Sequence, residues 1–267
     1  MKKFLIAVVF LCVLSLLPLT GFVAARSYRM PRGLDPEEGV SMLQDLEDVP
    51  LDEIQKKLDV IEQQRLEALA RAKRELKTQE IISLIQAGQL SYRKALSDLY
   101  IAGDSLMAGL EVYNILNANH ISAEVSASLH HLESNLSKIV AKHPPILLLH
   151  YGLNMISTND AQLNTFIRNY TSLIRQLQDK LPKTRIVVSL LFPVDRSKAV
   201  SPEFGRIDDY NSALKEMCTT LGVEWLDSAP AFGGSTAFYG ADGIHLSASF
   251  YRNNWLVHLI RELEIGA

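Results

Sequence analysis

Residues 98–110 read Asp98-Leu-Tyr-Ile-Ala-Gly-Asp-Ser-Leu-Met-Ala-Gly-Leu110. The apolar run at 99–102 predicts a buried strand, and the apolar spacing after Ser105 predicts a helix. When a strand enters a helix through a glycine, the first helical residue lies at the rim of the sheet, next to the free N–H groups of the helix start. A serine in this place can act as a nucleophile beside oxyanion donors. It can also simply cap the helix, a position that serine favours.

The chain after residue 97 alternates between strand-like and helical patterns. Its strand-like runs are continuously apolar, which is typical of strands that helices cover on both faces, and they lie at Leu99–Ala102, Ile146–Tyr151, Ile186–Phe192 and Val223–Leu226. The helical patterns lie at Leu106–Leu116, Val125–Val140, Ala161–Leu181, Ile207–Leu221 and Phe250–Leu263. This order predicts an α/β fold, a three-layer α/β/α arrangement with a mainly parallel sheet and a site at the carboxyl ends of the strands.

The composition argues against several classes of function. With 27 lysines and arginines against 30 aspartates and glutamates, the formal net charge is −3, so no nucleic-acid partner is expected. If a leader that contains Cys12 is removed, Cys218 is the one cysteine that remains, which excludes an intrachain disulfide. The segment 103–109 lacks the lysine and the spacing of a phosphate-binding loop, and the histidines show no metal-ligand spacing. Neither a cofactor nor a metal is predicted.

The N-terminal residues predict a targeting segment. Lys2 and Lys3 precede a mostly apolar run at 4–25, which as a helix would span roughly 33 Å and cross a bilayer. Because the run ends in Val23-Ala-Ala25, residues 1–25 are interpreted either as a signal peptide or as a membrane anchor. Both interpretations predict export. An anchor would hold the protein at the cell membrane through its N-terminal helix, with the rest of the chain outside, and a cleaved signal peptide would leave it secreted.

A charged, helical region is predicted at 26–96. A long helix extends from Pro50 to Gly88, and its apolar residues follow a three-four spacing at Leu51, Ile54, Leu58 and Ile61. Two interpretations stay open: a coiled-coil-like stalk through which the chain forms a homo-oligomer, and a helix that folds back on the domain or stays solvated. The predicted domains are thus 1–25, 26–96 and 97–267, and a chain that begins near Ser91 is expected to stay folded.

Two further segments place reactive side chains at the same edge of the predicted sheet. Asn154 follows the strand-like run at 146–151, and its amide can there donate to an oxyanion or can simply complete a turn. Asp242 and His245 lie three residues apart in the loop before the last helix. On a turn, this spacing lets the carboxylate hold the histidine Nδ1–H and leaves Nε2 free to take a proton from Ser105. The alternative is a helix-start aspartate and a surface histidine.

Taken in chain order, three of these segments resemble the sequence blocks of the SGNH (GDSL) hydrolase superfamily: Gly103-Asp-Ser105, Gly152-x-Asn154 and Asp242-x-x-His245. The resemblance covers about residues 97–263 and implies an SGNH-hydrolase-like, flavodoxin-like catalytic domain. It implies that Ser105 is the nucleophile, His245 the general base and Asp242 the group that orients the histidine. It also implies an oxyanion hole that includes Asn154 and the backbone N–H of Ser105.

The sequence departs from the family pattern at two positions. Ala123 stands where the family usually has a glycine whose N–H is a third oxyanion donor, and alanine can serve there only if its φ is not positive. Met155 stands where the family often has an aspartate after the asparagine, which removes a polar neighbour but no catalytic atom. The third donor is therefore expected from Ala123.

The resemblance implies an exported serine esterase or acyltransferase that works through an acyl-enzyme. The first expected substrate is an O-acetyl ester of a carbohydrate or cell-wall polymer. Tyr239, in the aromatic-containing loop 228–245, is expected to contact the sugar, or else to anchor this loop. Two alternatives remain: a lipase or lysophospholipase, and an inactive, membrane-tethered wall-binding module.

Overall fold

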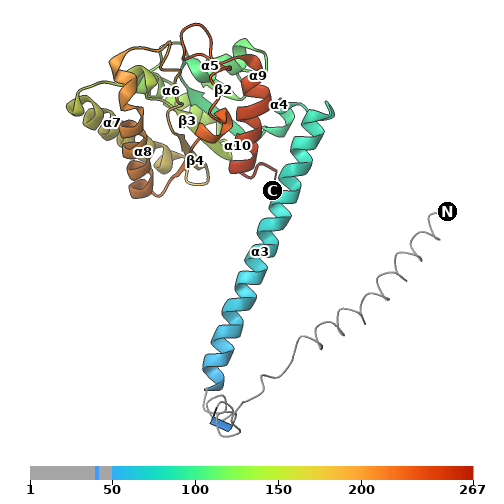
Figure 1. Cartoon of the computed structure of the whole chain (residues 1–267). Helices are drawn as coiled ribbons and strands as arrows, with labels where there is room; N and C mark the ends of the chain where they lie inside the picture. The colour runs from blue at the N-terminus through green and yellow to red at the C-terminus, as the bar shows by residue number, and fades with distance from the viewer. Residues whose placement is uncertain (1–39, 42–49, 267) are drawn as a thin grey trace, which may run out of the picture. The chain divides into compact units, whose positions relative to one another are not determined.

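The structure is a computed structural model that describes residues 40–41 and 50–266 (Figure 1). The predicted signal peptide or anchor at 1–25 lies outside the described residues, as does most of 26–49. The chain divides into two compact units, residues 1–66 and residues 67–267. The helices that the structure describes include none that is both long enough and apolar enough to cross a bilayer.

A sheet of five parallel strands forms the centre of the second unit, in the order β2-β1-β3-β4-β5. The strands are β1 (Leu99–Gly103), β2 (Ile121–Ala123), β3 (Ile146–His150), β4 (Arg185–Ser189) and β5 (Glu224–Leu226). All five residues of β1 are buried, as are the last four of β3 and of β4. The carboxyl ends of β1, β2 and β3 are in register, so the residues that follow these three strands meet at one edge.

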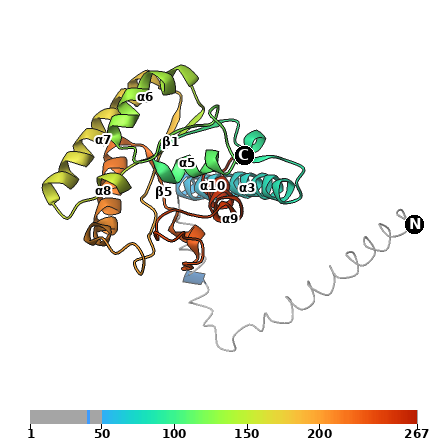
Figure 2. The same cartoon turned by 90° about the horizontal axis from the view of Figure 1, so that it is seen from above.

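Helices cover both faces of the sheet, as the sequence predicts (Figures 1 and 2). On one face, α6 packs against α7 and α7 against α8. On the other face lie α5 and the C-terminal helical segment. The helices of the two layers are α5 (Ser105–Val112), α6 (Leu129–Lys142), α7 (Asp160–Lys180), α8 (Ile207–Leu221), α9 (Ala248–Phe250), the π-helical turn η4 (Tyr251–Trp255) and α10 (Leu256–Glu262).

Each predicted strand and helix after residue 97 is observed, although some of their ends differ by three or four residues. The sequence predicts neither the short helix α4 (Tyr92–Ala95) nor the strand β2. This strand has three residues and lies at the edge of the sheet, so it shows neither a long apolar run nor a clear alternation. In the sequence, these residues stand out only through the resemblance at Ala123. The pairing of β2 with β1 places Ala123 opposite Gly103, which is what brings that residue to the candidate site.

The long helix α3 (Leu51–Gln86) takes part in the core of the second unit through its last turns. Thr78 and Ile82 are buried there, and Ile81 and Ile85 pack against the same core. Arg74 forms an ion pair with Glu264, with 2.9 Å between Nε and Oε2. Folding back on the domain, one of the two interpretations of the helix, therefore applies to this part of α3. The described residues of the first unit are exposed along their whole length.

A chain that begins near Ser91 is expected from the sequence to stay folded. Because it would lack the buried Ile82, the structure leads us to expect that such a chain is less stable than the whole second unit. We expect Ile82→Ala to lower the free energy of unfolding by about 2–5 kcal/mol, because it removes buried methyl groups and leaves a cavity. The matched control is Leu76→Ala on the same helix, where the side chain is 72% exposed and the cost should stay within about 0.5 kcal/mol. Urea denaturation measures both. Equal losses for the two variants would contradict a structural role for the end of α3.

Candidate active site

Ser105 is the first residue of α5, and Asp104 caps this helix. The Asp104 carboxylate accepts a hydrogen bond from the Leu106 N–H, with an N···O distance of 3.0 Å. Interpreting Ser105 as the helix cap is therefore wrong, because its neighbour fills that position. The Ser105 hydroxyl is left to interact elsewhere, while its own N–H belongs to the unpaired groups of the helix start.

His245 joins Ser105 to Asp242 in one chain of hydrogen bonds. Its Nε2 lies 3.0 Å from Ser105 Oγ, and its Nδ1 lies 2.6 Å from Asp242 Oδ2. The residues meet although Ser105 and His245 are 140 positions apart in the sequence. An ionised Asp242 can only accept a hydrogen bond, so it holds the histidine proton on Nδ1 and leaves Nε2 as the acceptor for the serine hydroxyl. The structure thus brings together all three residues that the sequence predicted for this chain of bonds.

The turn that carries Asp242 is held by the backbone as well. Oδ1 of Asp242 accepts the N–H groups of Ile244 and His245, at 2.9 and 3.0 Å. Partial burial acts to raise the pKa of Asp242, but the hydrogen bond from the His245 ring and the two N–H groups outweigh it and lower the pKa to about 2. The carboxylate is therefore ionised at any pH at which the protein would be active.

Asn154 lies in the short helical turn η1 (Leu153–Met155), directly after β3. Gly152 allows this turn, since its φ is +136° and a Cβ there would lie 2.9 Å from Leu191 and 3.0 Å from Phe166. The Asn154 side chain is exposed and donates one N–H to the Ala127 carbonyl, with an N···O distance of 3.0 Å. An amide has two N–H groups, so this contact orients the side chain and leaves the second one for a ligand.

Ala123 ends β2 beside the first residues of the site. Its partner Gly103 accepts a hydrogen bond from the next residue, Glu124, at 3.3 Å. Because the backbone groups of a parallel strand alternate in direction, the Ala123 N–H takes no part in the ladder of hydrogen bonds with β1. Ala123 is not among the described residues with positive φ, so the condition under which alanine can replace the family's glycine is met.

Three fully buried polar residues, Asp104, His150 and Ser189, lie behind the nucleophile, and the sequence analysis gave them no role. His150 Nδ1 lies 2.9 Å from Ser189 Oγ, and His150 Nε2 lies 3.9 Å from Asp104 Oδ1. Burial raises the pKa of Asp104, against the opposing effect of His150, and burial lowers the pKa of His150. Both shifts favour the neutral forms. The pKa of this buried carboxyl is shifted in the opposite direction from that of Asp242, although both residues lie close to Ser105.

A neighbouring loop holds the turn that carries Asp242 and His245. The Asp195 N–H donates to the Gly243 carbonyl at 2.8 Å. Gly243 has a φ of +71°, and a Cβ there would lie 2.7 Å from the Asp195 carbonyl oxygen, so only glycine fits. The Asp-Gly pair at 242–243 is a turn signal in the sequence. Nothing in the sequence indicated which loop would pack against it.

Tyr239 lies in the loop 228–245, which also carries Asp242 and His245, but its side chain contacts other residues. Its hydroxyl donates to the Pro193 carbonyl at 2.7 Å, and its ring stacks on Phe232 with 5.6 Å between the centroids. Burial raises the pKa of the Tyr239 hydroxyl. These contacts are those of a residue that anchors the loop. The contact of Tyr239 with a sugar, which the sequence analysis expects, stays a prediction.

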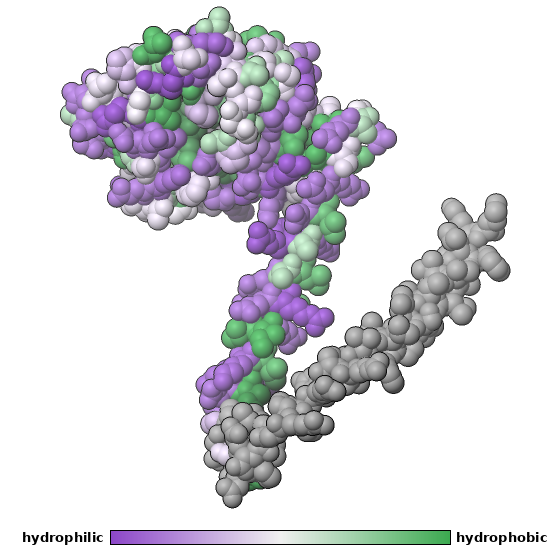
Figure 3. Space-filling model, viewed as in Figure 1, coloured by the Kyte–Doolittle hydropathy of each residue, from purple (hydrophilic) through white to green (hydrophobic). Residues whose placement is uncertain are grey.

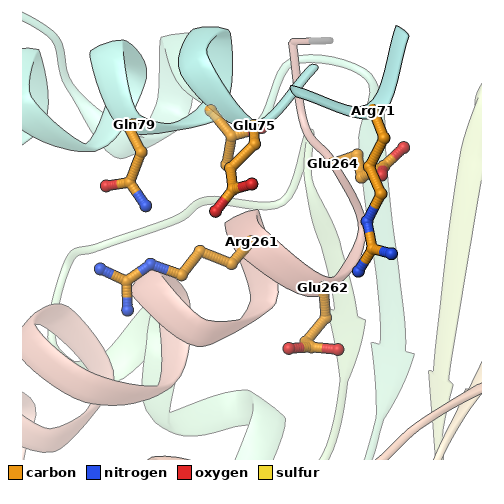
Figure 4. A pocket seen from close by; sticks show the side chains of 7 residues that line it. Arg71, Glu75, Gln79, Arg261, Glu262 and Glu264 are labelled. Carbon is orange, nitrogen blue, oxygen red and sulfur yellow. The ribbon is translucent and has the colours of Figure 1, made fainter. Parts of the chain in front are cut away.

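Neither the charged pocket beside α3 nor Cys218 offers a comparable set of reactive groups. A charged pocket of about 350 Å³ lies between α3 and α10 (Figure 4), and it is lined by Arg71, Glu75, Thr78, Gln79, Arg261, Glu262 and Glu264. None of these residues belongs to the predicted site, and no histidine lines the pocket.

Within residues 40–41 and 50–266, no cluster of histidine, cysteine, aspartate or glutamate side chains could hold a metal ion. Cys218 is buried, and burial raises the pKa of its thiol to about 12, so it is unreactive.

The lowered pKa of Asp242 predicts a pH-dependent contribution to stability. Because the carboxylate is stabilised in its ionised form, wild type should exceed Asp242→Asn in stability above the unfolded-state pKa of about 3.9, and the difference should vanish as the pH falls toward 2. The side chain is 48% exposed, so we expect a small, salt-sensitive difference. Urea denaturation from pH 7 to pH 2 measures it. A difference that persists unchanged at pH 2 would contradict the assignment.

Comparison with known proteins gives a family. Residues 86–252 match the model of the GDSL-like lipase/acylhydrolase family. Among solved structures, the chain is similar to a GDSL-like lipase from Bacteroides thetaiotaomicron, at 11% identity and a TM-score of 0.50, over 62% of this chain and 86% of that one. It is also similar to an acetylxylan esterase from Geobacillus stearothermophilus, at 14% identity and a TM-score of 0.47, over 63% of this chain and 94% of that one. No curated protein matches the sequence.

The family match extends over more than half of the chain and contains Ser105, Ala123, Asn154, Asp242 and His245. The parallel sheet with helices on both faces agrees with the SGNH-type α/β/α fold that the sequence predicted. The chain therefore belongs to the GDSL-like lipase/acylhydrolase family and is an ester-bond hydrolase.

Proposed function

We propose that the chain is a serine esterase in which Ser105 is the nucleophile, His245 the general base and Asp242 the residue that orients and stabilises the imidazolium. The observation that carries this proposal is the continuous chain of hydrogen bonds from Ser105 through His245 to Asp242, at 3.0 and 2.6 Å. The distance between Ser105 Oγ and His245 Nε2 lies within the range in which a hydroxyl passes its proton to a base, and the hydrogen bond to Asp242 orients that base. The same intact geometry argues against an inactive binding module.

The reaction follows from these positions. Ser105 Oγ attacks the ester carbonyl carbon while His245 Nε2 takes the hydroxyl proton. The tetrahedral intermediate expels the alcohol, which receives that proton from His245, and the acyl group stays on Ser105. Water then gives a proton to His245 and attacks the acyl-enzyme. Collapse of the second intermediate breaks the bond between the acyl carbon and Ser105 Oγ, which releases the carboxylic acid and returns the proton to Ser105. A sugar hydroxyl in the place of water would make the same steps an acyl transfer.

Three N–H groups are assigned to the oxyanion: the backbone groups of Ser105 and Ala123, and the side-chain amide of Asn154. They come from the ends of β1 and β2 and from the turn after β3, which are neighbours in the sheet. The amide of Asn154 is held by Ala127 before the substrate arrives, so little reorganisation is needed when charge develops. Each such donor contributes to the stability of the transition state more than to substrate binding.

For the substrate, we infer a short acyl ester on a carbohydrate, with O-acetyl groups first. The side chains of His245 and Asp242 are 52% and 48% exposed, so the reacting ester can be carried on a polymer. In the loops after β2 and β4, the large apolar side chains that are strongly exposed stand singly, at Val125 and Val200. A long acyl chain needs a continuous apolar surface, which single valines do not provide.

Export is proposed from the N-terminal sequence. The lysine pair and the apolar run at 4–25 would direct the chain across a membrane, and residues 1–25 would then be removed or would remain as an anchor. The catalytic unit would lie outside the cell in both cases, where polysaccharides are accessible. Sequencing the N-terminus of the mature protein distinguishes the two.

We also propose that the chain self-associates through the apolar residues of α3 that follow a three-four spacing. Its three-four stripe is exposed, at 84%, 38%, 54% and 59% for Leu51, Ile54, Leu58 and Ile61. Figure 3 shows apolar side chains along α3 between strongly hydrophilic ones. With Leu51 and Leu58 as a positions, Lys57 and Glu62 occupy g and e positions, so opposite charges would face each other in a parallel pair. Sedimentation of the full chain measures the oligomeric state.

The first functional prediction concerns Ser105 and His245. We expect Ser105→Ala and His245→Ala each to abolish turnover of p-nitrophenyl acetate, and the double variant to be scarcely worse, because the two residues act as one unit. Wild type should be labelled by a fluorophosphonate and Ser105→Ala should not. The control is Ser134→Ala, which alters an exposed serine whose hydroxyl bonds only within α6. Full activity in Ser105→Ala would refute the proposed function.

The second prediction concerns the acyl chain. We expect p-nitrophenyl acetate to be cleaved much faster than the octanoate, because no continuous apolar surface would bind the longer chain. Rates of kcat/KM over a series of chain lengths measure this preference. If the rate climbs with chain length, the enzyme is a lipase or lysophospholipase in its specificity, while the role of Ser105 would be unaffected.

A further inference from the structure

Three tyrosine hydroxyls bind the backbone next to the proposed catalytic residues. Tyr251 donates to the carbonyl of Leu106, the residue after Ser105, at 2.6 Å. Tyr113 donates to the carbonyl of Leu246, the residue after His245, at 3.0 Å. Tyr210 donates to the carbonyl of Met155, the residue after Asn154, at 3.0 Å. The nucleophile, the base and the side-chain oxyanion donor thus have the same kind of contact one position further along the chain.

We propose that Tyr113, Tyr210 and Tyr251 are positioning residues, which fix the distances among Ser105, His245 and Asn154 through these backbone carbonyls. The inference rests on the proposed function of those three residues and adds a structural cause for their geometry. None of the tyrosine hydroxyls is assigned a role in the chemistry itself.

Two of the contacts are reciprocal across one interface. Tyr113 ends α5, the helix that begins with Ser105, and it reaches the loop that carries His245. Tyr251 belongs to the helical segment after His245, and it reaches the first turn of α5. The rings of the two tyrosines lie 6.0 Å apart, between their centroids. Each element therefore holds the other, and a shift of either would change the distance between Ser105 Oγ and His245 Nε2.

The surroundings of Tyr251 restrict its movement. The residue is buried, and a Cβ at Gly109 would lie 3.1 Å from its hydroxyl oxygen, so α5 passes very close to the ring. The backbone at 251–255 forms a π-helical turn, a widening that shifts the side chains of a helix relative to its regular path. Burial raises the pKa of the Tyr251 hydroxyl, which keeps it protonated as a donor.

The third contact comes from the helix layer on the other face of the sheet (Figure 2). Tyr210 lies in α8, and its ring packs against Phe166 with 5.6 Å between the centroids. Its bond to Met155 fixes one side of the turn η1, and the bond from Asn154 to Ala127 fixes the other. Two helix layers therefore contribute: the layer that contains α5 holds Ser105 and His245, and the layer that contains α8 holds Asn154.

The test replaces each tyrosine by phenylalanine, which removes the hydroxyl and keeps the ring. We expect Tyr113→Phe, Tyr210→Phe and Tyr251→Phe each to lower kcat on p-nitrophenyl acetate by roughly 2- to 10-fold, the effect of one neutral hydrogen bond, with KM unchanged. Adding Tyr210→Phe to Asn154→Ala should cause no further loss, because the tyrosine acts through that asparagine.

Two controls separate positioning from general stability. Thr184→Val removes a hydroxyl bond of the same kind, to the Pro144 carbonyl, at the amino ends of β3 and β4. It should lower Tm about as much as the tyrosine variants and leave kcat unchanged. Tyr170→Phe removes a buried hydroxyl that has no hydrogen-bond partner among the described residues, so it should leave kcat unchanged and should not lower Tm. A loss of kcat in Thr184→Val as large as in the tyrosine variants would overturn the proposal, as would additive losses in the Asn154→Ala background.

A spectroscopic measurement keeps this test independent of turnover. We expect the ring ¹H and ¹³C chemical shifts of His245 to move in Tyr113→Phe and Tyr251→Phe, and to stay unchanged in Thr184→Val. Unmoved His245 signals in both tyrosine variants would overturn the proposal even if Ser105 is confirmed as the nucleophile. If wild type cleaves no ester, the proposed function fails, and the His245 signals still decide whether the tyrosines position the ring.

Discussion

The tight contact at the carboxyl end of β1 leaves no room for a side chain at position 103. A Cβ on Gly103 would lie 2.5 Å from Met107 Cγ and 3.0 Å from the His150 carbonyl oxygen. The glycine is therefore required by close packing rather than by an unusual φ. Because α5 begins immediately after this contact, Asp104 and Ser105 lie where the carboxyl ends of β1 and β3 meet. The position of Ser105 follows from that junction.

The parallel sheet then determines which other residues can reach the nucleophile. Since β2, β1 and β3 are adjacent, the end of β2 supplies Ala123, and the residues after β1 and β3 supply Ser105 and Asn154, all at one edge. His245 arrives differently. It follows β5, the strand at the other edge of the sheet, and returns to Ser105 because the C-terminal helical segment packs beside α5. The long loop before that segment is held by backbone bonds such as the one from Asp195 to Gly243.

Environment gives the two carboxyl groups near Ser105 opposite properties. Asp104 is fully buried, and burial raises its pKa, whereas Asp242 is half exposed, and its hydrogen bonds lower its pKa to about 2. The first acts as a helix cap below the surface, and the second is available as a permanent negative charge beside the imidazole. A charged partner of this kind stabilises the imidazolium that forms when the serine loses its proton. Residue type alone does not distinguish the two roles.

The sequence by itself determined the α/β class, four of the five strands, and the ordered blocks that contain Ser105, Asn154, Asp242 and His245. These features are local, since continuous apolar runs, turn glycines and short spacings can be read within a few residues. The tertiary structure alone decided that β2 joins the sheet, that the end of α3 enters the core, and that Asp104 rather than Ser105 caps α5. It also decided which tyrosine hydroxyl meets which carbonyl. Those contacts join residues that are up to 145 positions apart, and no local pattern specifies which distant partner will complete a hydrogen bond.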